Sequence, residues 1–310
     1  MLEGGVMRIF FVANAVLAAL FANPALAADI PLKAPPLPPP AVFSWTGFYG
    51  GANVGYSWGN SSNTWNIFAA NLGGATACPP ASGALCVAGT DSNHMNGVIG
   101  GLQIGYNWQT GRYVFGIETD FDATGQRGNQ TFNGANGAFL GGVIAPAPAA
   151  AAYTEKLSWL GILRGRVGIA SDHTLFYATG GLAYGEVKNT GSAAISGSTT
   201  GAGPCTAALP AFGTCPLGNW SNSADKTGWT IGGGIEQAFA GNWSVKVEYL
   251  YVDLGRVNTT FATLPGCFGG PGGAGCSLVR PGSGTISSRI TDNIVRLGLN
   301  YKFSGPAVAQ

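Results

Sequence analysis

The sequence predicts an all-β fold, an eight-stranded antiparallel transmembrane up-and-down β-barrel, on three observations. Runs of about ten residues alternate apolar side chains with small or polar ones, which is the period of a β-strand. The connections between these runs alternate between tight turns and long segments, as they do in outer-membrane barrels. Aromatic residues gather near the ends of the runs, where the two interfaces of a bilayer would lie.

The overall composition narrows the class of protein. Of 310 residues, 51 are glycine and only 9% are charged, whereas about a quarter of the residues of a soluble domain are charged. Fifteen basic residues nearly balance 14 acidic ones, so no net field would attract a polyanion. We therefore expect no nucleic-acid partner.

The first 27 residues are typical of a secretory signal peptide. Arg8 precedes the apolar run Ile9–Phe21, and a small-x-small cleavage site ends at Ala27. A transmembrane helix is the alternative, but this run is shorter than the roughly 20 residues needed to span a bilayer. We expect cleavage near Ala27, followed by a proline-rich periplasmic spacer at residues 28–42.

Four predicted strands follow, and each has one apolar face. In the first, Phe48 and Val54 share a face while Asn53 lies on the other. In the third, Phe115 lies on the apolar face and the acidic residues lie on the opposite face. The runs are 46–58, 97–108, 113–122 and 156–169.

Four more strands complete the predicted barrel, and three of them alternate as clearly as the first four. The fifth is ambiguous, because apolar side chains such as Phe176 and Leu175 occupy opposite faces and leave its register open. The runs are 175–187, 229–239, 243–251 and 295–303.

The connections predict which end of the barrel faces which compartment. Three are tight turns, at residues 109–112, 171–174 and 240–242. The other four connections are predicted to be long extracellular loops, because bacterial outer-membrane barrels place short turns in the periplasm and long loops outside the cell. These predicted loops are residues 60–94, 123–152, 188–226 and 256–287.

Charged residues occupy the faces opposite the apolar ones. In a soluble sandwich they would coat the outside, whereas in a small barrel they point into a narrow lumen and must be paired or hydrated. A structural ion-pair network and an ion path are both open interpretations. The predicted lumen network consists of Glu118, Arg164, Arg166, Glu236, Lys246, Glu248 and Arg296.

Six cysteines form three local pairs within segments rich in Gly, Ala and Pro. In an exported chain, an even number and close spacing favour disulfides. A metal site is the alternative, but none of the pairs has the tight spacing of a Cys-x-x-Cys motif. The predicted disulfides are Cys78 with Cys86, Cys205 with Cys215, and Cys267 with Cys276.

Several motifs carry a family resemblance. They are the prolines of Pro35–Pro40, the opening WTGFYGGANVGY at Trp45–Tyr56, the segment YATGGLAYG at Tyr177–Gly185, and the closing NIVRLGLNYKF at Asn293–Phe303. Over most of residues 43–303 the chain resembles the 25 to 31 kDa outer-membrane immunogenic proteins of alphaproteobacteria, small porin-family proteins with an OmpA-type barrel.

This resemblance implies an outer-membrane location, contact with lipid and lipopolysaccharide, and recognition by the barrel-insertion machinery. It also implies roles in envelope integrity and surface antigenicity and, for some members, haem binding or limited solute passage. One departure is the short tail at residues 304–310, since family members often end on the aromatic residue that here is Phe303.

The sequence offers little chemistry for catalysis. His94 and His173 are its two histidines, and the predicted topology puts them at opposite ends of the barrel. We therefore expect that the protein has no enzymatic activity and binds neither a metal ion nor a cofactor. A haem site is a lesser alternative, with His94 and either Tyr56 or Tyr106 as ligands.

We therefore expect a structural surface barrel that supports the envelope and displays its loops as an antigen or to a host partner. A small porin-like channel for ions or very small solutes is one alternative, because charges line the predicted lumen. A surface haem-binding protein is the other.

Overall fold

The computed structural model describes residues 43–68, 86–140, 143–196, 214–262, 267–269, 276–278 and 283–303. The predicted signal peptide (1–27), the spacer (28–42) and the tail (304–310) lie outside the described residues, so they stay predictions. Among the described residues, no helix is long and apolar enough to cross a membrane.

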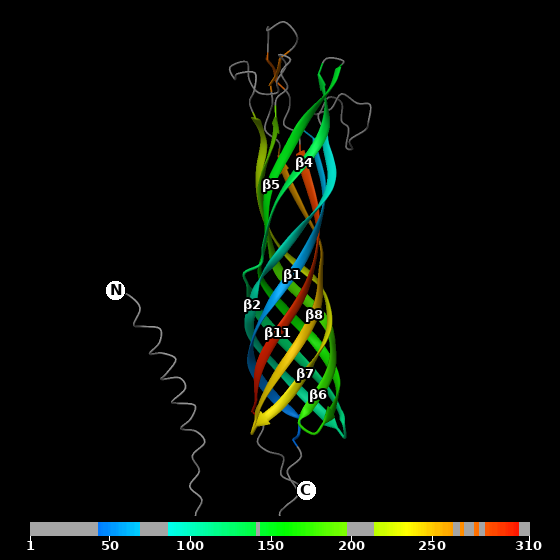
Figure 1. Ribbon diagram of the computed structural model, residues 1–310, viewed down its shortest axis with the longest axis vertical. Helices are drawn as coiled ribbons and strands as arrows, with labels where there is room; N and C mark the ends of the chain where they lie inside the picture. Colours follow the sequence, from blue (N-terminus) through cyan, green and yellow to red (C-terminus); the bar gives the residue numbers. More distant parts are fainter. Residues whose placement is uncertain are drawn as a thin grey trace, which may run out of the picture. The chain divides into compact units, whose positions relative to one another are not determined.

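Antiparallel strands close into a ring (Figure 1). The order is β1-β11-β8-β7-β6-β5-β3-β2, and a β1–β2 ladder closes it; β4 continues the position of β3, since both pair with β5. The ring therefore has eight strand positions, which confirms the predicted fold class. Its strands are β1 (Gly47–Phe68), β2 (Cys86–Thr110), β3 (Tyr113–Thr124), β4 (Arg127–Leu140), β5 (Val143–Ser171), β6 (Thr174–Ser196), β7 (Thr214–Ala240), β8 (Trp243–Ala262) and β11 (Ser283–Lys302). A separate two-stranded sheet pairs β9 (Cys267–Gly269) with β10 (Cys276–Leu278).

Three two-residue turns mark one end of the ring, here called the turn end. Each begins with a residue of positive φ, namely Gly111, Asp172 and Gly241. Glycine adopts this conformation without a steric penalty, and Asp tolerates it better than most residues. The predicted tight turns are therefore confirmed. The opposite end of the ring is called the distal end.

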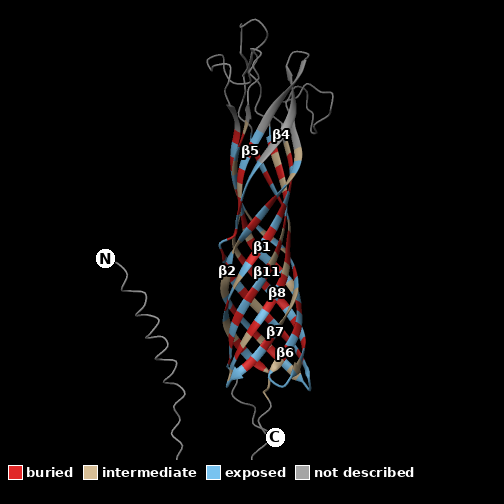
Figure 2. Cartoon of the chain, viewed as in Figure 1, coloured by how far each residue is buried: buried red, intermediate tan, exposed pale blue. Residues whose placement is uncertain are grey.

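Wherever burial is described, side chains alternate between the interior and the outside along the strands of the ring (Figure 2). Near the turn end, the outward positions are apolar and exposed, for example Leu102 at 70% and Phe48 at 60%. These positions form a continuous band, here called the belt. Its strand segments are 48–58, 98–108, 113–121, 159–169, 176–184, 229–239, 243–251 and 295–303. Their lengths are close to the 9–11 residues with which a tilted strand spans a bilayer.

The register that the sequence left open in β6 is decided by burial. Phe176 and Leu182 are more than half exposed, whereas Leu175 and Val187 are buried. The first pair lies in the belt and the second pair packs in the interior, so both faces of this strand are apolar because both are covered, one by lipid and one by the core.

The predicted loop boundaries are wrong, because strands continue far beyond the belt. β1 and β2 remain paired from Trp58 and Asn96 out to Phe68 and Cys86. Outward positions in this part are polar, for example Ser62. Since the outer face no longer meets lipid, the apolar alternation that marks a strand in the sequence fades there, although the backbone ladder persists.

Beyond the belt the ring separates into two sheets. Among the described residues, β2 pairs with β4 only at Asn96 and Arg127, and the β7–β8 ladder ends at Trp229 and Asp253. The distal parts pair as β2–β1–β11–β8 and as β4–β5–β6–β7. These sheets enclose buried side chains such as Trp65, and together they are called the distal sandwich.

Candidate functional site

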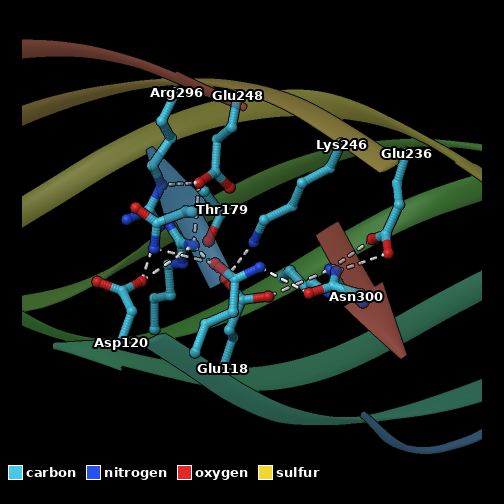
Figure 3. A network of polar contacts seen from close by, with 12 residues as sticks. Glu118, Asp120, Thr179, Glu236, Lys246, Glu248, Arg296 and Asn300 are labelled. Carbon is cyan, nitrogen blue, oxygen red and sulfur yellow. Dashed lines mark hydrogen bonds and ion pairs between the residues drawn. The ribbon is translucent and has the colours of Figure 1, made fainter. Parts of the chain in front are cut away.

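The structure brings all seven predicted lumen residues together, within the part of the ring that the belt surrounds (Figure 3). Each occupies an inward position of its strand, and each is at most 5% exposed. Glycines on neighbouring strands leave room for these long side chains. A Cβ at Gly298, for instance, would lie 2.9 Å from Lys246 Cε.

Glu118 on β3 is the centre of one half of the network. Its carboxylate contacts Lys246 Nζ at 2.7 Å, Arg166 at 3.5 Å and also Arg164. Tyr49 donates its hydroxyl to the same carboxylate at 2.6 Å. One buried acid is thus bound by three cations from β5 and β8.

Arg296 on β11 is the centre of the other half. Its guanidinium lies 2.7 Å from Asp120, 3.0 Å from Asp122 and 2.8 Å from Glu248. Arg164 also approaches Glu248, at 3.0 Å, and so joins the two halves. All of these side chains are almost completely buried.

Arg166 makes several further contacts besides its ion pair with Glu118. It pairs with Glu236 at 3.0 Å and donates to the Asn107 side chain at 2.8 Å. Its guanidinium also lies 4.6 Å from the Tyr49 ring centroid and 5.3 Å from that of Tyr177. Such cation–π contacts gain strength when the cation is desolvated.

The predicted network omitted Asp120 and Asp122, although both share the inward face of β3 with Glu118 at a spacing of two residues. Their addition changes the balance from three acids and four bases to five acids and four bases. The spacing from Glu118 is the sequence signal that identifies them. Mutual pairing is what makes such burial tolerable, because each isolated buried ion would cost several kcal/mol.

An apolar layer lies at each end of the charged network. Toward the turn end, buried Trp45 packs with Val114, Leu175 and Tyr177. Toward the distal end a larger cluster fills the interior, and it is called the apolar seal. Its members are Met95, Ile99, Leu157, Leu160, Ile162, Ala183, Val187, Leu250, Val252, Leu254, Val257, Ile290 and Ile294. The charged groups are therefore enclosed on both sides by apolar side chains.

Beyond the apolar seal, the interior of the distal sandwich combines buried aromatic side chains, such as Trp65 and Trp220, with a network of polar groups. Tyr153 donates to Asp91 at 2.6 Å, and Asn93 and Asn189 donate to Glu155 at 3.3 and 3.2 Å. Burial raises the pKa of Glu155, and burial together with the hydrogen bond to Asp91 raises the pKa of Tyr153. The bonds made by Asp91 and Asn93 tie the two sheets to each other, since both residues belong to β2 whereas Tyr153 and Glu155 belong to β5.

The two histidines do not share a site. His94 lies on β2 opposite Asn60, with 2.6 Å between the ring Nδ1 and the amide oxygen. Tyr106 is paired with Phe48 near the turn end, so it is far along the strand from His94, and Tyr56 is paired with Val98, four residues away from His94. His173 lies in a turn. Neither Tyr56 nor Tyr106 lies beside His94, so the described residues place no second haem ligand there. The haem hypothesis stays a prediction.

No cluster of three or more His, Cys, Asp or Glu side chains suited to a metal ion occurs within the described part of the chain. Cys78 and Cys205 lie outside the described residues, as do the side chains of the other four cysteines. The three disulfides therefore stay predictions.

Comparisons with known proteins agree with this architecture. A family model described as "Outer membrane protein beta-barrel domain" matches residues 15–303. The 31 kDa outer-membrane immunogenic protein of Brucella melitensis is 35% identical over 295 residues, covering 93% of this chain and 98% of that protein. The 22 kDa outer membrane protein of Rhizobium leguminosarum is 27% identical over 210 residues, 68% of each chain. Among solved structures, the outer membrane protease OmpT of Escherichia coli covers 84% of this chain and 98% of its own at 9% identity, with a TM-score of 0.36. That score is too low to add to the assignment.

Proposed function

The chain belongs to the outer membrane protein β-barrel domain family, and from that premise we propose that it is a closed structural barrel that presents its distal sandwich at the cell surface. The resemblance drawn from its motifs and its outer-membrane location are confirmed. Its relatives are named as outer-membrane immunogenic proteins, not as enzymes. With short turns in the periplasm, the distal sandwich faces the exterior.

The observation that carries this proposal is the filled interior. Leu160, Ile162 and Leu250 of the apolar seal are fully buried, and Trp45 is buried at the turn end. Eight-stranded barrels have an interior only wide enough for their own side chains. The tightly packed apolar seal, in series with a self-paired charge network, opposes ion passage, which supports a structural role over the porin-like alternative.

Planar-bilayer recordings test the closed barrel. Protein reconstituted at high salt is expected to give no conductance steps of reproducible size, whereas a 16-stranded porin prepared in the same way gives them. A gel that compares boiled and unboiled samples must first show that the barrel is folded. Reproducible channels from folded protein would refute the proposal and favour the porin-like alternative.

The haem-binding alternative is tested separately. Titration of haem into folded protein would produce a Soret shift, and that shift would be lost in His94→Ala if His94 were a ligand. The structural proposal expects no difference between wild type and His94→Ala, because the ring lies outward with Asn60 as its hydrogen-bond partner.

A further inference from the structure

An acidic side chain lies within the apolar seal. Asp292 on β11 is 2% exposed, and the inward residues on either side of it along the strand, Ile290 and Ile294, both belong to the seal. Its register partner on β8, Val252, is a third member. Asp292 lies three residues beyond the belt on β11, and Val252 lies one residue beyond it on β8. The carboxyl group is therefore buried among apolar side chains outside the part of the ring that crosses the membrane.

The chain supplies this carboxyl group with hydrogen-bond donors but with no cation. Ser57 on β1 donates its hydroxyl to Asp292 Oδ2 at 2.6 Å, and the side-chain amide of Gln126 donates to the Ser57 hydroxyl. None of the ion pairs between described residues includes Asp292, whereas the nearby Asp253 on β8 is paired with Arg289 at 2.8 Å. An isolated carboxylate is costly to bury, and such a group avoids the cost by taking up a proton.

The groups around the Asp292 carboxyl on the neighbouring strands are uncharged. They are Ser57 on β1, Met95 on β2, Gln126 between β3 and β4, and Val252 on β8. On β11 itself, Arg296 is the next inward cation, and its guanidinium is already bound by Asp120, Asp122 and Glu248. No described side chain therefore offsets a negative charge on Asp292.

Two buried oxygen atoms of this cluster have no hydrogen-bond partner, and both are acceptors. They are Asp292 Oδ1 and Gln126 Oε1. Glu155, a buried acid of the distal sandwich, differs in this respect, because its two oxygens accept from Asn93 and Asn189. The cluster around Asp292 thus lacks a donor. A proton on the carboxyl group supplies that donor and removes the charge at the same time.

A proton also fits this site better than a metal ion does. A metal ion needs several oxygen ligands at once, and the described part of the chain contains no cluster of three or more His, Cys, Asp or Glu side chains suited to one. A proton needs a single carboxylate oxygen. The site therefore matches the smallest cation.

We propose that Asp292 is a proton-binding site inside the apolar seal, and that release of its proton loosens the packing of the seal. With the proton bound, the layer around Ile290 and Ile294 carries no charge. Without it, an unpaired carboxylate lies among apolar side chains and draws in water, because water is the remaining source of donors for Oδ1. This switch acts at the distal boundary of the lumen and is independent of whether the barrel conducts ions.

The direction of the pH effect follows from burial. Burial raises the pKa of Asp292 to about 6, against about 3.9 in an unfolded chain. The bound proton therefore contributes its full stabilisation below about pH 4, and this contribution is lost as pH rises through about 6. Because the two pKa values differ by about two units, the folding equilibrium constant should fall by up to about 100-fold across this range.

The test combines infrared spectroscopy with urea unfolding of the full-length protein in lipid vesicles. A protonated carboxyl group has a carbonyl stretch that a carboxylate lacks, so spectra of the folded protein are recorded from about pH 4 to about pH 8. Asp292→Asn introduces a neutral side chain of the same shape. This variant should lose the part of the band that titrates near pH 6, and its urea midpoint should depend less on pH than that of the wild type.

Two further variants separate this site from general effects of burial. Ser57→Ala removes the hydroxyl that donates to the carboxylate, so it should move the titration of the Asp292 band to higher pH. Asp253→Asn is the matched control, because it removes a nearby acid that is paired with Arg289, and it should leave the titration unchanged. Unboiled gel mobility verifies that each variant is folded.

Three outcomes would overturn the proposal. The same infrared titration in wild type and Asp292→Asn would mean that this carboxyl holds no proton in the range measured. A band that is lost in Asp292→Asn without any change in the pH dependence of the urea midpoint would mean that the proton does not affect the seal. Absence of the band at acidic pH, together with stability that rises with sodium concentration, would mean that a metal ion occupies the site.

Discussion

Arg296→Met is the most direct test of the lumen network. The guanidinium is completely buried and contacts Asp120, Asp122 and Glu248 at 2.7, 3.0 and 2.8 Å. Methionine is of comparable length but uncharged, so three carboxylates lose a shared cation in a site that the apolar layers separate from water. Removal of one partner from a buried ion pair costs about 3–5 kcal/mol, a large fraction of the roughly 5–15 kcal/mol that typically stabilises a folded domain.

The assay is equilibrium unfolding by urea in lipid vesicles, followed by tryptophan fluorescence. Adding Asp122→Asn to Arg296→Met removes one of the stranded charges and should restore roughly 0.5–3 kcal/mol, the usual coupling energy of contacting residues. The control is Arg289→Met, whose ion pair with Asp253 is exposed on the Arg289 side and should matter little. A loss for Arg296→Met no larger than that for Arg289→Met would refute the reasoning.

Three further predictions follow from packing and burial. Gly101→Ala should abolish the folded band of unboiled samples on a gel, because its Cβ would lie 2.0 Å from a carbonyl oxygen of β3. The control Gly180→Ala should keep the folded band, because its Cβ would lie 3.5 Å from the nearest atom. Retention of the band by both variants would contradict the prediction. Leu160→Ala should lower the free energy of unfolding by about 2–5 kcal/mol, and by more than Leu102→Ala on the lipid face; the reverse order would mean that the apolar seal is not packed. The raised pKa of Glu155 means that the folded protein binds a proton more tightly than the unfolded chain, so this group's contribution to stability falls as pH rises from the unfolded value of about 4.3 through the folded pKa. Glu155→Gln should therefore flatten the pH dependence of the urea midpoint between acidic and neutral pH, and an unchanged slope would count against it.

Local pattern was enough to predict the belt and the charged lumen. Phe48 and Asn53 alternate because one meets lipid and the other meets the interior, and Glu118 with Arg164 had to be paired once both pointed inward. These features depend on a two-residue period and on the cost of buried charge, and both are visible in a single strand. The turns are equally local, since Gly111 and Gly241 permit the positive φ that the turns adopt.

Only the tertiary structure decided the distal half. Ser62 and Thr190 lie in stretches rich in Ser, Thr, Asn and Gly, which are typical of loops. These strands face water on one side and an interior of mixed polar and aromatic side chains on the other, so they lack the regular apolar alternation that would identify them in the sequence. The pairing of these strands into two sheets and the apolar seal around Leu160 and Leu250 depend on contacts between strands distant in sequence. Within the belt, sequence by itself determined which residues face lipid and which face inward, except in β6, where both faces are apolar and only burial in the folded barrel distinguishes them. Register between strands determined which of them meet, because a shift by one residue would send every side chain to the other face.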